Sequence, residues 1–262
     1  MPTRNTPFAP GTPCWVDLLS SDKEASRTFY TELFGWSSLD AGPEYGDYTN
    51  FSSDGHKVAG MMANSPDSGT SDCWNTYLST ADIEATVASA TEAGAQPIVP
   101  AMQVGDLGSM AVLIDPAGGA FGVWQPAAHT GFQKYNEPGS VTWDEYHSRD
   151  FATSSAFYTK VFGWTIEYTS DTDDFRYLTA HLGDGGESVA GMMDSHTFLL
   201  PGAPSMWTVY FSTVDIDASS ARAVELGGTL IRPAEDTPFG RLAELADPTG
   251  ALFKLHSAPT GG

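Results

Sequence analysis

The sequence FYTELFGW at residues 29–36 returns almost unchanged as FYTKVFGW at residues 157–164. Six of the eight positions are identical, and the offset of 128 residues is close to half of the 262-residue chain. Three further motifs repeat at offsets of 131 to 133 residues: AGMM (59–62 and 190–193), STAD and STVD (79–82 and 212–215), and DPAG and DPTG (115–118 and 247–250). Repeats of this kind decide the architecture, because each copy forms the same structural unit. The sequence therefore predicts a duplicated protein.

Both halves show the same order of predicted elements. A strand-like segment at 13–19 or 140–147 is followed by an apolar stripe at helical spacing that begins after Asp22 or Asp150 and ends at Gly35 or Gly163. Aspartate is a suitable N-cap and glycine a suitable C-terminal stop. A second strand and helix follow at 74–93 and 207–226, with further strands after each helix. The order is βαβββ four times, which predicts an α+β fold.

The repeat also divides the chain. We expect a first domain at residues 1–128, a linker rich in glycine and proline at 129–139, and a second domain at 140–262. Copies of this length have the usual size of a domain, so we expect two hydrophobic cores.

Composition excludes several classes of partner. The chain carries 33 acidic and 12 basic residues, a formal net charge of −21. Nucleic acids and anionic membranes need a basic surface, so neither is an expected partner. No apolar run approaches the ~18 residues of a membrane span, and the first 13 residues lack the apolar core of a signal peptide, so we expect a cytoplasmic protein. Cys14 and Cys73 form no CxxC pair, which argues against a disulfide framework or a thiolate zinc site.

The combination of four βαβββ units, the FYxxxFGW helix end and the DPxG turn resembles the vicinal oxygen chelate superfamily of glyoxalases, extradiol dioxygenases and bleomycin-resistance proteins. The resemblance runs from about Pro13 to His256 and is greatest to the actinobacterial members with two tandem domains. It implies a curved sheet in each half, whose concave face forms a ligand cleft. It also implies a divalent metal held by residues of the first, fifth and eighth strands of a domain.

The six positions that the resemblance assigns to metal ligands carry unsuitable residues. Counting from the helix caps and the DPxG turns places these positions at Trp15, Thr76, Gly122, Trp143, Val209 and Lys254. Indole, glycine and an ammonium group donate no electron pair to a metal, and a single hydroxyl is a poor ligand. We therefore expect neither a metal nor another cofactor. A displaced site made of Glu145, His147 and His256 stays chemically possible.

Strand alternation identifies the side chains that would share each cleft. We predict Asp17, Glu145 and His256 as acid–base groups, because a carboxylate among indoles has a raised pKa. The predicted ligand-binding residues are Trp15, Trp124, Trp143, His147 and Lys254. In the alternative interpretation, the indoles are core packing and the carboxylates are bonded to nearby donors. Tyr77 and Tyr210 are expected to point away from the clefts.

Three functions remain open. The favoured one is a metal-independent protein that binds an aromatic or polyketide-like small molecule. The second is a metal-independent tailoring enzyme, such as an isomerase, cyclase or lyase, that uses Asp17, Glu145 or His256. The third and least favoured is a metal-dependent glyoxalase or dioxygenase. The last strands differ between the halves, with Gly122 and Trp124 opposite Lys254 and His256, which places a specialised activity in the second half. A monomer and a homodimer are both allowed.

Overall fold

The computed structural model describes residues 4–65, 67, 69–199 and 202–257. Its first half contains a short 3₁₀ turn at Pro43–Tyr45 and the elements β1 (Pro13–Ser20), α1 (Lys23–Phe34), β2 (Ser37–Asp40), β3 (Thr49–Ser53), β4 (His56–Ala63), β5 (Cys73–Ser79), α2 (Ile83–Glu92), β6 (Gln96–Val104), β7 (Gly108–Ile114) and β8 (Ala120–Pro126). The second half contains β9 (Val141–Ser148), α3 (Phe151–Phe162), β10 (Trp164–Asp171), β11 (Arg176–Leu182), β12 (Ser188–Asp194), β13 (Met206–Ser212), α4 (Ile216–Glu225), β14 (Thr229–Thr237), β15 (Gly240–Ala246) and β16 (Leu252–Ser257). The predicted α+β fold with four βαβββ units is confirmed.

The helix ends follow the predicted signals. The carboxylates of Asp22 and Asp150 accept the backbone N–H groups of Ala25 and Thr153, which caps α1 and α3. Both helices end at a glycine, Gly35 or Gly163, with a φ of 68°. Only glycine adopts this left-handed conformation without strain, so the FGW motif stops each helix at the same place.

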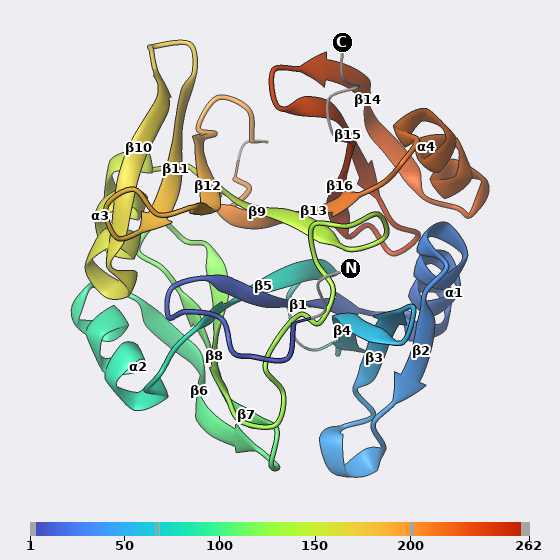
Figure 1. The fold of residues 1–262 in the computed structure, drawn as a ribbon, viewed down its shortest axis with the longest axis horizontal. Helices are drawn as coiled ribbons and strands as arrows, with labels where there is room; N and C mark the ends of the chain where they lie inside the picture. Colours follow the sequence, from blue (N-terminus) through green and yellow to red (C-terminus); the bar gives the residue numbers. More distant parts are fainter. Residues whose placement is uncertain (1–3, 66, 68, 200–201, 258–262) are drawn as a thin grey trace.

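Each half forms one eight-stranded sheet with the same strand order. The orders are β2-β3-β4-β1-β5-β8-β7-β6 and β10-β11-β12-β9-β13-β16-β15-β14. The first strand of each half is parallel to the fourth and antiparallel to the fifth, so the two βαβββ units of a half meet at the centre of its sheet. Figure 1 shows the two sheets stacked, with β9 and β13 of the second sheet above β1 and β5 of the first near the middle of the view.

The two halves share their hydrophobic cores. One cluster joins mainly the first and last βαβββ units, where Phe29 and Phe34 of α1 contact Phe253 and Phe211 at ring-centroid distances of 6.0 and 5.1 Å. The other joins the two middle units, where Phe121 contacts Phe157 at 5.8 Å. Accordingly, α1 lies beside α4 and α2 beside α3 (Figure 1). The described residues thus form two main buried clusters, as expected, but each cluster draws on both halves.

The faces of the two sheets that point towards each other are packed together and joined by a buried polar contact. Thr76 Oγ1 of β5 donates to Asp144 Oδ1 of β9 at 2.8 Å, and both residues are buried. This contact assigns alternate residues of the central strands to the face between the sheets and leaves the others on the outer, concave faces. In the described part of the chain, no helix is long and apolar enough to cross a membrane.

Candidate functional site

On the concave face of each sheet, a tryptophan of the first strand lies opposite a tyrosine of the fifth strand. Trp15 is paired with Tyr77 in the first sheet, and Trp143 is paired with Tyr210 in the second. Paired residues of neighbouring strands point to the same face. The expectation that Tyr77 and Tyr210 point away from the clefts is therefore wrong.

The physical reason is that the cleft-facing position of the fifth strand lies one residue beyond the position that we assigned from the helix caps. The position assigned to the fifth-strand ligand fell on Thr76 and Val209, which are fully buried, and Thr76 faces the other sheet through its bond to Asp144. A shift of one residue along a strand exchanges its two faces. The register between the fifth strand and the first determines which side chain faces the cleft. The sequence alone does not specify this register.

In the second half, the concave face holds a polar cluster around Glu145. Its Oε1 accepts the hydroxyl proton of Tyr210 at 2.6 Å and lies 2.7 Å from His147 Nε2. Lys254 Nζ donates to the Tyr210 oxygen at 2.7 Å and lies 3.5 Å from Glu145 Oε1 and 3.3 Å from His147 Nε2. The structure thus brings together three predicted site residues, which are Glu145, His147 and Lys254, and adds Tyr210.

Glu145 is ionised in this environment. Burial alone would raise its pKa, but the Lys254 ammonium and the hydrogen bonds from His147 and Tyr210 outweigh burial and hold the pKa well below the usual range of a glutamate. The carboxylate is therefore a fixed negative charge, stabilised by the groups around it. The prediction of a raised pKa for a carboxylate among indoles does not hold for Glu145.

A row of paired side chains extends the cluster across the sheet. Arg232 of β14 is paired with Glu244 of β15, Glu244 with Lys254 of β16, and Lys254 with Tyr210 of β13. Arg232 Nε and Glu244 Oε2 form an ion pair at 3.1 Å. We call Arg232, Glu244, Lys254 and Tyr210 the charged row.

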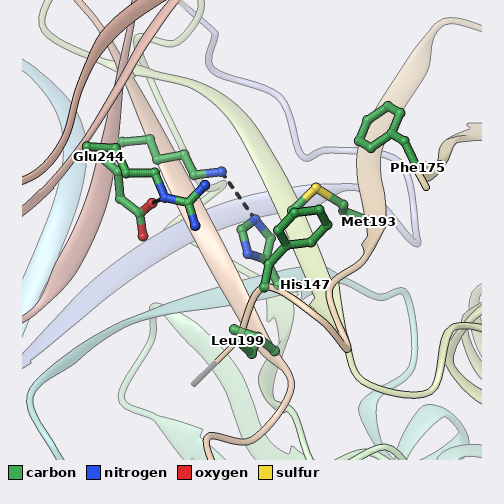
Figure 2. A pocket seen from close by; sticks show the side chains of 8 residues that line it. His147, Phe175, Met193, Leu199 and Glu244 are labelled. Atoms are coloured by element: carbon green, nitrogen blue, oxygen red, sulfur yellow. Dashed lines mark hydrogen bonds and ion pairs between the residues drawn. The ribbon is translucent and has the colours of Figure 1, made fainter. Parts of the chain in front are cut away.

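A cavity of about 230 Å³ lies over the charged row. It is lined by His147, Phe175, Met193, Phe198, Leu199, Arg232, Glu244 and Lys254. Figure 2 shows the imidazole of His147 beneath the thioether of Met193, with Phe175, Leu199 and Glu244 around them. Phe175 and Phe198 are 39 and 47% exposed, so the wall of the cavity presents aromatic surface that the protein itself does not cover.

In the first half, the corresponding residues form a smaller cluster. Trp15 Nε1 donates to the hydroxyl of Tyr48 at 2.8 Å, and that hydroxyl lies 3.4 Å from Asp17 Oδ2. The residue beside Tyr77 on β8 is Gly122, where the second half has Lys254. Asp17 therefore has no ammonium partner of the kind that Glu145 has, and its Oδ1 accepts no hydrogen bond from the described residues. Burial raises the pKa of Asp17 to about 7, and the nearby polar groups of Tyr77, Tyr48 and Asn75 lower the pKa by less than burial raises it.

The linker covers this first concave face. The rings of His129 and Phe132 contact Trp15 at centroid distances of 4.5 and 5.6 Å, and Trp124 Nε1 donates to the carbonyl of His129. Burial lowers the pKa of His129 to about 3, so its ring is neutral. Trp15, Trp124 and Phe132 are all buried in the core cluster that joins the outer units. The structure thus packs two predicted ligand-binding residues, Trp15 and Trp124, beneath the linker.

His256 does not join Glu145 in the described structure. It is paired with Ser212, two residues along the strands from the Tyr210–Lys254 pair. Its Nε2 lies 3.0 Å from the carbonyl oxygen of Phe239. Glu145 and His256, both predicted as acid–base groups, are therefore not bonded to each other, and the cation beside Glu145 is Lys254. Trp143 remains on the concave face, half-buried, and its Nε1 donates to the Tyr177 hydroxyl at 3.1 Å.

The residues of the second cleft do not fit a metal ion. Among the described residues, no group of three or more His, Cys, Asp or Glu side chains is arranged to hold one. Glu145 and His147 offer two donor atoms, but the Lys254 ammonium lies within 3.5 Å of both. Its positive charge occupies the side of these donors that a divalent cation would need and repels such a cation.

Two tyrosines and the cavity wall were missed by sequence reasoning. A Cβ atom at Gly60 or Gly191 would lie 1.7 or 2.1 Å from the hydroxyl of Tyr48 or Tyr177, so the glycine of each AGMM motif makes room for a tyrosine. A glycine inside a strand often marks such a close approach, and that signal was available. Phe175 and Phe198 lie on loops, Arg232 on the edge strand β14 and Glu244 on the neighbouring strand β15, and the sequence carries no equivalent signal at these positions.

Comparisons with known proteins agree with this architecture. The family model described as "Glyoxalase/Bleomycin resistance protein/Dioxygenase superfamily" matches residues 14–123 and 145–255. The chain belongs to this superfamily, which confirms the resemblance drawn from the sequence motifs. It is 37% identical to CFP32 of Mycobacterium tuberculosis, over 99% of both chains; the name of that protein assigns it provisionally to the glyoxylases. It is 38% identical to the anthracycline biosynthesis protein DnrV of Streptomyces peucetius, over 95% of this chain and 94% of DnrV.

Solved structures show the same fold at low identity. The Mn(II)-bound glyoxalase of Novosphingobium aromaticivorans aligns with a TM-score of 0.65 and 16% identity, over 95% of this chain and 82% of the glyoxalase. At this identity the similarity establishes the fold alone.

Proposed function

We propose that the protein binds a planar aromatic metabolite of polyketide type, without a metal, in the cleft of its second half. The observation that carries the proposal is the charged row beneath an aromatic cavity, in which the Lys254 ammonium stands where a metal would contact Glu145 and His147. Flat aromatic ligands bury their faces against phenylalanine and methionine side chains, while a few polar groups fix their orientation.

Two further observations support this choice of ligand. The relative DnrV is named for anthracycline biosynthesis, and the anthraquinone part of an anthracycline is planar and aromatic. The exposed rings of Phe175 and Phe198 line the cavity, whereas the exposed large apolar residues of the described first half are all aliphatic.

Titration of the purified protein with polycyclic hydroxyquinones, followed by tryptophan fluorescence and calorimetry, tests the proposal. We expect binding to persist after treatment with a chelator, and Phe198→Ala to weaken it about tenfold, or ~1.4 kcal/mol. Leu39→Ala is the control, because Leu39 is exposed at 73% in the first half. Binding that requires an added divalent metal, or that Phe198→Ala leaves unchanged, would contradict the proposal.

A second candidate function is supported by the Tyr210 hydroxyl. This group donates to Glu145 and accepts from Lys254, so a proton-transfer group is held at a fixed position beside the cavity. A metal-independent isomerase, cyclase or lyase would use Tyr210, Glu145 and Lys254 rather than Asp17 or His256. Turnover of a bound compound that Tyr210→Phe abolishes while binding is retained would establish the enzyme; turnover that survives this change would exclude Tyr210 as the acid.

A further inference from the structure

The charged row offers an anion-binding subsite inside the cavity. We propose that Lys254 and Arg232 hold an ionised oxygen of the ligand, so that the compounds taken by this cleft are acidic phenols or enols. This inference rests on the proposed function and adds the chemical class of the group that the cleft recognises.

The first support is the hydrogen bonding of Lys254. An ammonium group has three N–H donors. One makes a short bond to the Tyr210 oxygen at 2.7 Å, while the contacts with His147 Nε2 and Glu145 Oε1 are longer, at 3.3 and 3.5 Å. When His147 Nε2 itself donates to Glu145, it offers Lys254 no lone pair. The ammonium therefore retains donor capacity, and its residue lines the cavity.

The second support is Arg232, a cationic side chain that lines the same cavity. Its Nε forms an ion pair with Glu244 Oε2 at 3.1 Å, and the two terminal NH2 groups of the guanidinium, with four N–H donors, lie outside that contact. The Arg232 side chain is 60% exposed, so a ligand oxygen reaches it without displacing a buried partner. Two of the 12 basic residues in a chain of net charge −21 thus meet at one cavity.

The third support is the apolar wall. Phe175, Met193, Phe198 and Leu199 reduce the water around the ligand, and an ion pair is stronger in such a medium than in bulk solvent. The hydroxyl of a bound phenol loses its proton to solvent at the mouth of the cavity, and Lys254 keeps its own proton. The phenolate then pairs with the ammonium, which lowers the pKa of the bound phenol by about 1–3 units.

The test uses 1,2-dihydroxyanthraquinone, whose visible absorption changes on ionisation, with 9,10-anthraquinone as the analogue that lacks hydroxyl groups. We expect the bound dihydroxy dye to ionise at least one pH unit below the free dye, and the analogue to bind at least tenfold more weakly. Lys254→Met should abolish the shift, Lys254→Arg should keep most of it, and Arg232→Met should reduce it. Lys160→Met, which removes an exposed lysine of α3, should leave it unchanged.

Arg232→Met keeps the test decisive if Lys254→Met does not fold, because Arg232 is exposed. A bound dye that ionises at the same pH as the free dye overturns the inference, as does equal binding of the two quinones; in both cases the proposed function stands. Failure of both quinones to bind overturns the inference and the proposed function together. A shift that both Lys254→Met and Arg232→Met leave intact also overturns the inference.

Discussion

The two concave faces of this protein share a scaffold and differ in chemistry. In the second half, the row across the outer strands carries Arg232, Glu244 and Lys254; in the first half, the paired positions are Val99, Val112 and Gly122. Both rows continue into a tyrosine and a tryptophan, Tyr210 with Trp143 and Tyr77 with Trp15. The tyrosine and tryptophan are therefore part of the repeated structure, whereas the charges belong to one copy.

The difference explains why similar carboxylates titrate in opposite directions. Asp17 and Glu145 occupy the same place on their first strands, and both are buried. Glu145 has an ammonium group and an imidazole within 3.5 Å, whereas Asp17 has hydroxyl and amide partners. A neutral partner does not offset the loss of hydration of a charge, so Asp17 holds its proton up to a pH of about 7 while Glu145 is ionised.

The largest effect is expected at Glu145. Glu145→Gln removes the charge that pairs with Lys254 and leaves the ammonium buried without a carboxylate, which costs about 3–5 kcal/mol of the free energy of unfolding. The loss should be full at pH 8 and should begin to shrink only as the pH falls below ~4.3, the ordinary pKa of a glutamate in the unfolded chain, towards the lower pKa of the folded carboxylate. Urea denaturation at pH 8, pH 4 and pH 2 measures this dependence, and most of the loss should remain at pH 4.

Glu244→Gln is the matched control in the same row. Its partner Arg232 is 60% exposed, so the ion pair is screened and its removal should cost under ~1 kcal/mol. Equal losses for Glu145→Gln and Glu244→Gln would show that the buried cluster contributes no more than a surface ion pair.

A smaller effect separates the packed cleft from the open one. Phe132→Ala removes a ring that is 3% exposed and packs on Trp15, and we expect a loss of about 3 kcal/mol in unfolding free energy. Phe198→Ala changes a ring that is 47% exposed, so its stability should change by under ~0.5 kcal/mol while ligand affinity falls. Thermal denaturation and ligand titration of both variants provide the comparison. If Phe132→Ala left stability intact and opened the first half to the same ligands, the linker would be a cover rather than part of the core.

The sequence predicted the repeated fold because its signals are local. Asp22 caps a helix, Gly35 ends it, and the repeat supplies the same pattern again at Asp150 and Gly163, so element types and order follow from short segments. The pairing of the sheets was not predictable in this way. The contact between Phe29 and Phe253 joins residues at opposite ends of the chain, and nothing in either segment specifies the other.

The site was predicted in part for the same reason. The ligand positions that the resemblance implies, together with strand alternation, placed Glu145, His147 and Lys254 on one face, because alternation within a strand is local. Tyr210 was misplaced because its face depends on the register between β9 and β13. The burial of Trp15 depends on the path of the linker, where His129 and Phe132 lie far from this indole in sequence but contact it in the fold.

Apart from the control variants, the smallest change in stability is expected at Asp17, and its sign is opposite to that at Glu145. Folding raises the pKa of the Asp17 carboxyl from near 3.8 to about 7. The protein therefore loses free energy of unfolding as the pH rises through this interval. Asp17→Asn removes this loss, and we expect a gain of ~2 kcal/mol in unfolding free energy at pH 8 and almost no change at pH 4, since the shift sets a ceiling of about 4 kcal/mol. Denaturation at the two pH values, beside Glu145→Gln, tests whether the same position has opposite effects in the two halves. A loss of stability for Asp17→Asn at pH 8 would mean that Tyr48 and Tyr77 hold Asp17 as an anion, and the contrast between the clefts would then lie in their covering alone.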